Sequence, residues 1–444
     1  MKLKYENWGE KGEAVAAACF FLICFFKSFW YLELPNIFLR MLMFAGAMLA
    51  FFISKPHSFI KMSKLEILWL IALGVPIMSR VFRTYDGNGI KETLGFTTFY
   101  LCSTIYALSC VRNRTLMKAS FKIISVYSVI LVFCTILFRY TPQLYMEHIL
   151  VLFNRQEDLA KGYLSGNMSG LTSHYSTNAI YMALAVILTV CSMIVNRKNS
   201  GNKRKVLLYF TFVTASAALL MTGKRGQLIF TIVAAAAGYY FYMSDRTKGR
   251  IFRVFSILIL SLLISYAGYL LIPDIFSSVT RMINKMDSVD VTTGRARLWT
   301  MALEYFKNYP LAGIGFKQFL RITELDVHNI YLQFLCETGI AGTVIYMTAL
   351  TYTLKVNFKN LISARKLHLY ENCEDEFFLL FSFMYQVFFL TYGITGNPFY
   401  DLPTLFPYMF SVGITLYYKK ENKLQNSGQE QIDELQFRHH STRL

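Results

Sequence analysis

Apolar runs of about 20 residues recur along the whole chain, and charged residues break the sequence between them. A run of this length can cross the hydrocarbon core of a bilayer as one helix. Because lipid offers the backbone no hydrogen bonds, each such run must satisfy its own N–H and C=O groups, which a helix does. The pattern therefore predicts an all-α polytopic integral membrane protein.

The same pattern predicts about twelve transmembrane helices in a single transmembrane domain, residues 1–418. The first run lacks a small-residue cleavage site, so we expect it to be retained rather than removed as a signal peptide. Residues 419–444 are polar and rich in Gln, Glu and Lys, which is typical of a disordered tail. The spans are predicted at residues 14–32, 37–53, 65–79, 93–111, 119–138, 175–195, 205–221, 226–243, 251–272, 328–354, 377–394 and 402–418.

The distribution of charge argues against binding to nucleic acid. The formal net charge is +18, yet charged residues make up only 16% of the chain and apolar residues 55%. The basic residues gather in short loops between apolar runs, which is the distribution of a positive-inside membrane protein. The eight cysteines show neither a disulfide framework nor a metal-binding spacing, and we interpret them as small packing residues.

Most of the basic loops fall on one side of the membrane, whereas the short loops 33–36 and 395–401 on the other side carry no Lys or Arg, and this difference predicts the orientation of the chain. Both termini and the tail 419–444 are predicted to face the cytoplasm. Two loops on the other side are long, residues 139–174 and residues 273–327. Each contains an apolar stretch, 144–153 and 298–306, that could form a short helix on the membrane surface.

His328 and Asn329 open an apolar run in which Glu337 is the next charged residue. A histidine can accept and return a proton near neutral pH, so His328 is a candidate general base at the mouth of a membrane helix. A lone histidine at a membrane interface can also be an amphipathic end group with its polar tip in water. Gly339 and Gly342 stand three residues apart, which predicts a helix face that another backbone approaches closely.

Basic residues on the predicted outer face break the positive-inside rule, and they are candidates for binding anions. Guanidinium groups suit bidentate capture of phosphate oxygens, although an arginine can also snorkel or pair with a nearby acid. The loop 273–327 carries seven basic and six acidic residues, so it is not a broad basic surface. The candidates are Lys224 and Arg225 in the turn 222–226, Arg80 and Arg83 beside the turn 84–89, and Arg295 and Arg297 in the loop 273–327.

Metal, nucleotide and ion-coupled chemistry receive little support. Glu324, Asp326 and His328 alternate and would share one face of an extended stretch, which could suit a metal ion. Pairing of the two acids with Arg321 or Arg295 explains them equally well, and we expect neither a metal nor a cofactor. The sequence has no Walker-type phosphate loop, and its predicted spans hold few acids, which disfavours an ion-coupled transporter.

In their order and membrane positions, these motifs resemble those of the bacterial O-antigen ligase and O-antigen polymerase superfamily. The resemblance is specific over residues 205–345. His328-Asn329, nine residues and then Gly339-Ile-Ala-Gly342 are similar to the family's H-N-x9-G-x-x-G signature. The turn 222–226 resembles its short arginine turn, and Gly294-Arg295, Trp299, Asn308-Tyr-Pro310 and Gly313-Ile-Gly315 resemble its GR…W…P…GxG stretch.

The resemblance implies a fold similar to the GT-C membrane glycosyltransferases, which use polyprenyl-linked sugars as donors. It implies that His328 is the catalytic base and that Arg225 and Arg295 bind the pyrophosphate of the donor. Lys224 stands where the family commonly has a small polar residue. Beyond these, we expect substrate-binding roles for Lys224, Asn329, Arg80, Arg83 and Arg297.

We therefore expect a polymerase of O-antigen, capsule or exopolysaccharide repeat units on the outer face of the bacterial cytoplasmic membrane. The expected partners are an undecaprenyl-pyrophosphate-linked glycan donor, a glycan acceptor, membrane lipid and a chain-length regulator protein. A ligase that transfers the glycan to lipid A–core would use the same residues, and this alternative stays open. A polysaccharide or lipid flippase is the alternative from another class; it predicts charges along the spans and inverted repeats, which the sequence lacks.

Overall fold

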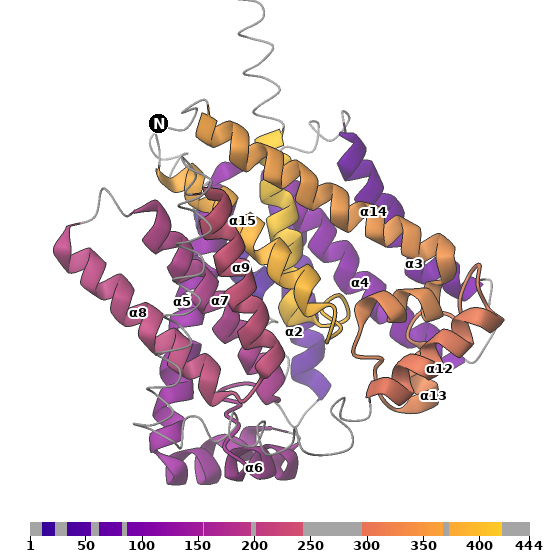
Figure 1. Ribbon diagram of the computed structural model, residues 1–444, viewed down its shortest axis with the longest axis horizontal. Coiled ribbons are helices and arrows are strands. Elements are labelled where there is room, and N and C mark those ends of the chain that lie inside the picture. The colour runs from indigo at the N-terminus through magenta and orange to yellow at the C-terminus, as the bar shows by residue number, and fades with distance from the viewer. Residues whose placement is uncertain are drawn as a thin grey trace, which may run out of the picture.

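The computed structural model describes residues 11–22, 33–54, 62–81, 87–153, 155–196, 201–242, 295–366 and 373–419. Within these ranges every regular element is a helix, as the hydropathy pattern predicted. The helices stand side by side in a bundle, and α14 runs obliquely across it (Figure 1). In chain order the elements are α2 (Glu33–Ile53), α3 (Lys64–Val81), α4 (Gly87–Cys110), α5 (Arg114–Tyr140), η2 (Leu144–Ile149), η3 (Leu150–Leu152), α6 (Gln156–Leu164), α7 (Tyr175–Val195), α8 (Asn202–Met221), α9 (Arg225–Tyr242), α12 (Arg295–Asn308), α13 (Gln318–Thr323), α14 (Ile330–Lys366) and α15 (Cys373–Tyr392); residues 11–22 and 402–419 are also helical.

Each predicted span within the described residues coincides with a helix. The predicted span 251–272 and the second half of the span 14–32 lie outside those residues. Four of the described helices, α5, α7, α8 and α14, are long and apolar enough to cross a membrane. The chain is thus helical with several candidate spans, while the full count of about twelve spans stays a prediction.

Helix α7 lies at the centre of the bundle. Its sequence contains no charged residue, and most of its side chains are buried. It packs against α5, α8, α9 and α15. A helix that is apolar on all sides can be buried against other helices without leaving a charged group unpaired, which is consistent with the position of α7.

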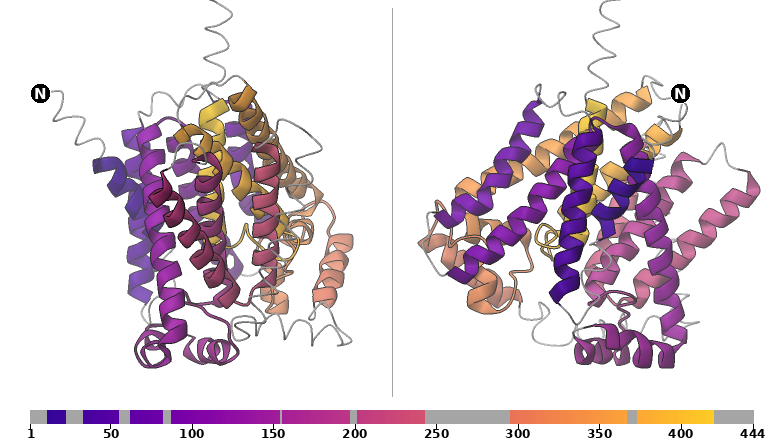
Figure 2. Two further views of the ribbon diagram at one scale, coloured as in Figure 1. Left: turned by 60° about the vertical axis from the view of Figure 1, so that its left-hand side comes forward. Right: turned by 180° about the vertical axis from the view of Figure 1, so that it is seen from behind.

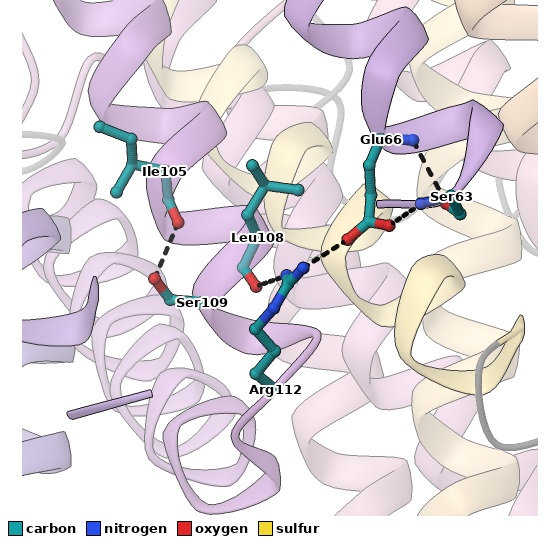
Figure 3. Close-up of polar contacts among 6 residues, drawn as sticks. All are labelled: Ser63, Glu66, Ile105, Leu108, Ser109 and Arg112. Atoms are coloured by element: carbon teal, nitrogen blue, oxygen red, sulfur yellow. Dashed lines mark hydrogen bonds and ion pairs between the residues drawn. The ribbon is translucent and has the colours of Figure 1, made fainter. Parts of the chain in front are cut away.

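The beginning of α3 is fixed by a capping box and a buried ion pair, which Figure 3 shows in close-up. Ser63 N–H donates to Glu66 Oε2 at 2.5 Å, and Glu66 N–H donates to Ser63 Oγ at 3.4 Å. The other carboxylate oxygen, Glu66 Oε1, lies 3.0 Å from Arg112 Nη2, and both side chains are at most 6% exposed. Arg112 also donates to the carbonyl oxygen of Leu108 at 2.9 Å, so the pair joins the start of α3 to the end of α4.

The short helices of the two long loops gather at one end of the bundle. Both views of Figure 2 place α6 at that end, opposite the end that the last helix, residues 402–419, reaches. The stretches 144–153 and 298–306 are helical as predicted, in η2, η3 and α12. Met168 N–H donates to the carbonyl oxygen of Met221 at 2.9 Å, and Ile330 N–H donates to that of Gly393 at 2.9 Å. The first bond ties the loop 139–174 to the end of α8, and the second joins the start of α14 to the residue that follows α15.

Candidate functional site

The backbone beside His328 is held from two sides. Trp299 Nε1 of α12 donates to the carbonyl oxygen of Val327 at 3.1 Å, and Val327 N–H donates to Gln333 Oε1 of α14 at 3.3 Å. His328 itself has φ of +55°, a left-handed conformation that costs a non-glycine residue about 1 kcal/mol. The surrounding contacts must offset this cost, and they fix His328 in the turn before α14.

Asn329 caps the N-terminus of α14. Its Oδ1 accepts hydrogen bonds from Tyr331 N–H at 3.0 Å and from Leu332 N–H at 3.1 Å. These are two of the backbone donors that a helix leaves without internal partners. The amide oxygen is therefore engaged with the helix, and a substrate contact from Asn329 stays a prediction that would use its Nδ2 group.

His328 is half-buried among charges from two other segments. Burial lowers its pKa first, the positive charge of Arg295 lowers it further, and Lys224 adds a smaller effect in the same direction. Asp326 opposes them by raising the pKa. The sum keeps the imidazole neutral at physiological pH, which is the form that can accept a proton.

Lys224 reaches this cluster from the tight turn between α8 and α9. Gly223 has φ of +69°, which lets the chain reverse within the turn. The Lys224 ammonium lies 4.4 Å from the centre of the Tyr175 ring, a cation–π contact. Burial and the charge of Arg295 lower the pKa of Lys224 to about 8. The structure thus brings Lys224, Arg295 and His328 into one electrostatic cluster.

Three other arginines predicted to bind substrate are exposed or lie outside the described residues. Arg225 is exposed in the first turn of α9, and Arg297 is exposed on α12. Arg83 lies outside the described residues. The charge of Lys224, the neighbour of Arg225, acts on His328. Substrate or phosphate binding by these arginines stays a prediction.

Arg80 is buried and holds three segments together. Its Nε donates to Thr93 Oγ1 of α4 at 3.1 Å, and its Nη1 donates to Gln318 Oε1 of α13 at 2.9 Å. It also lies against Gly89, where a Cβ would collide with the guanidinium group. These contacts favour a positioning role for Arg80, and the predicted substrate contact stays untested.

His174 belongs to the same region, although the sequence analysis did not single it out. It caps the N-terminus of α7, where its Nδ1 accepts a hydrogen bond from Ser176 N–H at 3.1 Å. Its ring stacks on Tyr175 with the ring centres 4.2 Å apart. Burial and the charge of Lys224 are the main causes that lower the pKa of His174 to about 4. The sequence signal was a polar residue directly before an uncharged apolar run, which marks a cap but not a site.

Glu337 is fully buried and accepts four hydrogen bonds. Tyr400 OH donates to its Oε2 at 2.7 Å and Lys317 N–H to the same oxygen at 2.9 Å. Phe319 N–H donates to Oε1 at 3.2 Å and Gln333 Nε2 to Oε1 at 3.1 Å. The carboxylate is thus satisfied entirely by polar groups of other segments and of α14 itself. Through Gln333, which also holds Val327, this carboxylate is linked to the turn that carries His328.

Gly339 interrupts α14, where the sequence predicted one continuous span. Its φ is +61° with ψ of −168°, so the helix bends there. A Cβ at this position would collide with the carbonyl group of Leu311, and Ile340 N–H donates to the carbonyl oxygen of Pro310 at 2.8 Å. The close backbone approach predicted at Gly339 is confirmed. At Gly342 the neighbour on another helix is instead a side chain, Val75 of α3.

The proposed metal face of Glu324, Asp326 and His328 required an extended stretch. Glu324 has φ of +58° and His328 has φ of +55°, so the backbone is left-handed at both ends. Within the described part of the chain, no three His, Cys, Asp or Glu side chains group as metal ligands would.

The bundle and its site define a polytopic helical membrane protein with a histidine and cations gathered at one end of the helices. Residues 210–347 match the family model described as O-antigen ligase. The match contains the turn 222–226, Arg295 and the stretch from His328 to Gly342, so the resemblance to the O-antigen ligase and polymerase superfamily that these motifs indicated is confirmed over this segment. A comparison with curated proteins found no match.

Proposed function

We propose that the protein is a polymerase that joins undecaprenyl-pyrophosphate-linked oligosaccharide repeat units by inverting glycosyl transfer. The observation that carries the proposal is the cluster of a half-buried His328 with Arg295 and Lys224 inside the O-antigen ligase segment. A general base beside fixed positive charge matches the two demands of this reaction. The acceptor must lose a proton, and the leaving pyrophosphate must be stabilised.

The transfer step follows from these roles. The hydroxyl oxygen of the acceptor sugar attacks the anomeric carbon of the donor, and its proton passes to the His328 imidazole. The bond between the anomeric carbon and the phosphate oxygen breaks, and its electron pair leaves with undecaprenyl pyrophosphate. Direct attack inverts the configuration at that carbon. In this scheme the positive charges of Arg295, Lys224 and Arg225 stabilise the negative charge that develops on the leaving pyrophosphate, and no metal ion is required.

The two cations near His328 also tune the base. In the unliganded protein they lower the pKa of the imidazole and so keep it unprotonated. When the pyrophosphate binds, its negative charge offsets theirs, and the imidazole becomes a stronger base at the moment that the acceptor must be deprotonated. Binding of the donor would thereby prepare the histidine for catalysis.

The orientation belongs to the proposal as well. We place the site on the outer face of the bacterial cytoplasmic membrane, with both termini inside and residues 1–418 as one transmembrane domain. The loops 139–174 and 273–327 then form the outer surface around the site, and the tail 419–444 lies in the cytoplasm. The lipid-linked donor would enter from the bilayer, and a chain-length regulator protein would be a further partner.

A ligase is the second candidate, because the family segment and the site serve both reactions. Purified protein with one defined lipid-linked repeat unit separates the two. Chain extension from this substrate alone, unaffected by excess EDTA, is the outcome expected of a polymerase. Transfer that requires lipid A–core or another added acceptor would identify a ligase. Movement of intact lipid-linked glycan across a vesicle wall without a new glycosidic bond would contradict both and favour a flippase.

A further inference from the structure

His174 and Lys224 come from different segments and meet on one aromatic ring. The His174 ring stacks on Tyr175, and the Lys224 ammonium lies over the ring of the same tyrosine. The charge of Lys224 acts on His174, and the charge of Arg295 acts on Lys224. Arg295 also acts on His328. His174 therefore borders the cluster that the proposed function uses.

The hydrogen bond at Nδ1 fixes the protonation of His174. Because Nδ1 accepts the Ser176 N–H bond, it presents a lone pair, and the ring proton must be on Nε2. The charged groups that face the ring are Lys224 from the α8–α9 turn, and Arg155 and Asp158 at the start of α6. Burial, Lys224 and Arg155 lower its pKa to about 4, and Asp158 opposes them weakly. The ring is neutral at physiological pH.

A neutral N–H donor suits an anion site that already holds cations. A third positive charge beside Lys224 and Arg295 would add repulsion and a cost of desolvation. A neutral imidazole adds a directed hydrogen bond without that repulsion. Within the described part of the chain, the His174 ring makes its hydrogen bond at Nδ1. Its Nε2–H group can therefore serve a ligand.

We propose that His174 donates a hydrogen bond from Nε2 to a phosphate oxygen of the lipid-linked pyrophosphate, in a subsite shared with Lys224 and Arg295. The inference rests on the proposed function, because it assigns a further binding residue to the same donor. His174 would hold the leaving group, while His328 acts on the acceptor. The site would thus contain two neutral histidines with opposite tasks, one that gives a hydrogen bond and one that takes a proton.

The competing explanation is that His174 only caps α7. Two substitutions separate the explanations, because serine is a good N-cap but its short side chain lacks the N–H group of the imidazole. His174→Ser keeps the cap and removes the donor, whereas His174→Ala removes both. His174→Thr, a second capping residue, replaces His174→Ser if the serine variant is not recovered from membranes.

The probe is inorganic pyrophosphate, measured by the rise in thermal midpoint of the purified full-length protein and by inhibition of glycosyl transfer. We expect His174→Ser to keep the wild-type thermal midpoint without ligand and to show a smaller pyrophosphate-induced rise. We also expect its catalytic efficiency with the lipid-linked donor to fall roughly 10- to 100-fold, as for a lost hydrogen bond to a charged group.

A wild-type response to pyrophosphate and wild-type efficiency in His174→Ser would overturn the inference and leave a capping role only. No pyrophosphate-induced rise in the wild-type protein would also overturn it. Failure of the proposed function looks different, since the wild-type protein would then form no glycosidic bond whatever residue stands at position 174. The pyrophosphate measurement still tests His174 in that case, because it does not depend on turnover.

Discussion

The Tyr400 hydroxyl donates a 2.7 Å hydrogen bond to Glu337, and both side chains are buried where the segment 393–401 meets α14. The same carboxylate accepts the backbone N–H groups of Lys317 and Phe319, so one acid joins three segments of the chain. Gln333 connects this acid to Val327, beside His328. The position of the proposed base thus depends on a buried network below it.

Glu337→Gln should lower both stability and turnover. The amide has one acceptor oxygen for the four donors that surround the carboxylate, and its NH2 group would face some of them. We expect a loss of about 2–4 kcal/mol in the free energy of unfolding, measured as a lowered thermal midpoint in detergent. Glu324→Gln, at an exposed acid directly after α13, is the control and should leave the midpoint unchanged. A wild-type midpoint in Glu337→Gln would show that the network does not hold these segments.

Arg112→Ala should destabilise the junction between the start of α3 and the end of α4. It leaves the Glu66 carboxylate buried without the charge that neutralises it, and breaking a buried pair in this way costs about 3–5 kcal/mol. The matched control is Lys161→Ala, because the Lys161–Glu157 pair is exposed and its charged atoms are 3.9 Å apart. Thermal midpoints of the two variants should differ clearly. Equal midpoints would contradict the importance of the Glu66–Arg112 pair.

The Michaelis constant for the lipid-linked donor should rise as pH increases through about 8. Lys224 has a lowered pKa in the folded protein, so its ammonium is present below that pH and is lost above it. Loss of this positive charge weakens binding of an anion. Lys224→Arg should keep a low Michaelis constant up to pH 9.5, because a guanidinium stays charged throughout this range. A wild-type Michaelis constant that does not change between pH 7 and pH 9.5 would remove Lys224 from donor binding.

Gly339→Ala should prevent normal folding or assembly of α14. Its positive φ and the neighbouring Leu311 carbonyl group leave no room for a Cβ, so the loop 310–312 would have to move. Gly95→Ala in α4 is the control, since a Cβ there meets nothing within 4 Å and alanine favours a helix. Yield in membranes and thermal midpoint measure both variants. A well-folded Gly339→Ala protein would mean that the interruption of α14 is not required.

The sequence predicts the helices well because an apolar run in a membrane must satisfy its own backbone N–H and C=O groups, which a helix does. The capping box of Ser63 and Glu66 is also readable, since it depends on residues three apart. The bend at Gly339 was not predicted, because it depends on a backbone segment near Leu311 that packs there only in the folded chain. His174 was missed for a similar reason: the charge of Lys224, which follows α8, reaches it only after α7 and α8 have packed.

The sequence also could not show that residues 324–328 depart from an extended conformation. Left-handed backbone at Glu324 and His328 is unusual for such residues and arises from the contacts around the turn. Trp299 and Gln333 supply those contacts beside His328. Trp299 is distant from His328 in sequence, and Gln333 lies within the first turns of α14. Spacing alone could identify His328 as a candidate, but not the conformation in which it is held.

The central claim is that His328 accepts the proton of the acceptor hydroxyl, and one measurement tests it most directly. Purified wild-type protein and His328→Ala are given the same defined lipid-linked repeat unit, and the rate of formation of the dimeric glycan is measured. The thermal midpoints of both proteins are measured as well, to show that the variant is folded. The account predicts a fall of roughly 10²–10⁴-fold for His328→Ala, the range for loss of a general base. A His328→Ala protein that is folded and forms the glycosidic bond at the wild-type rate would contradict it.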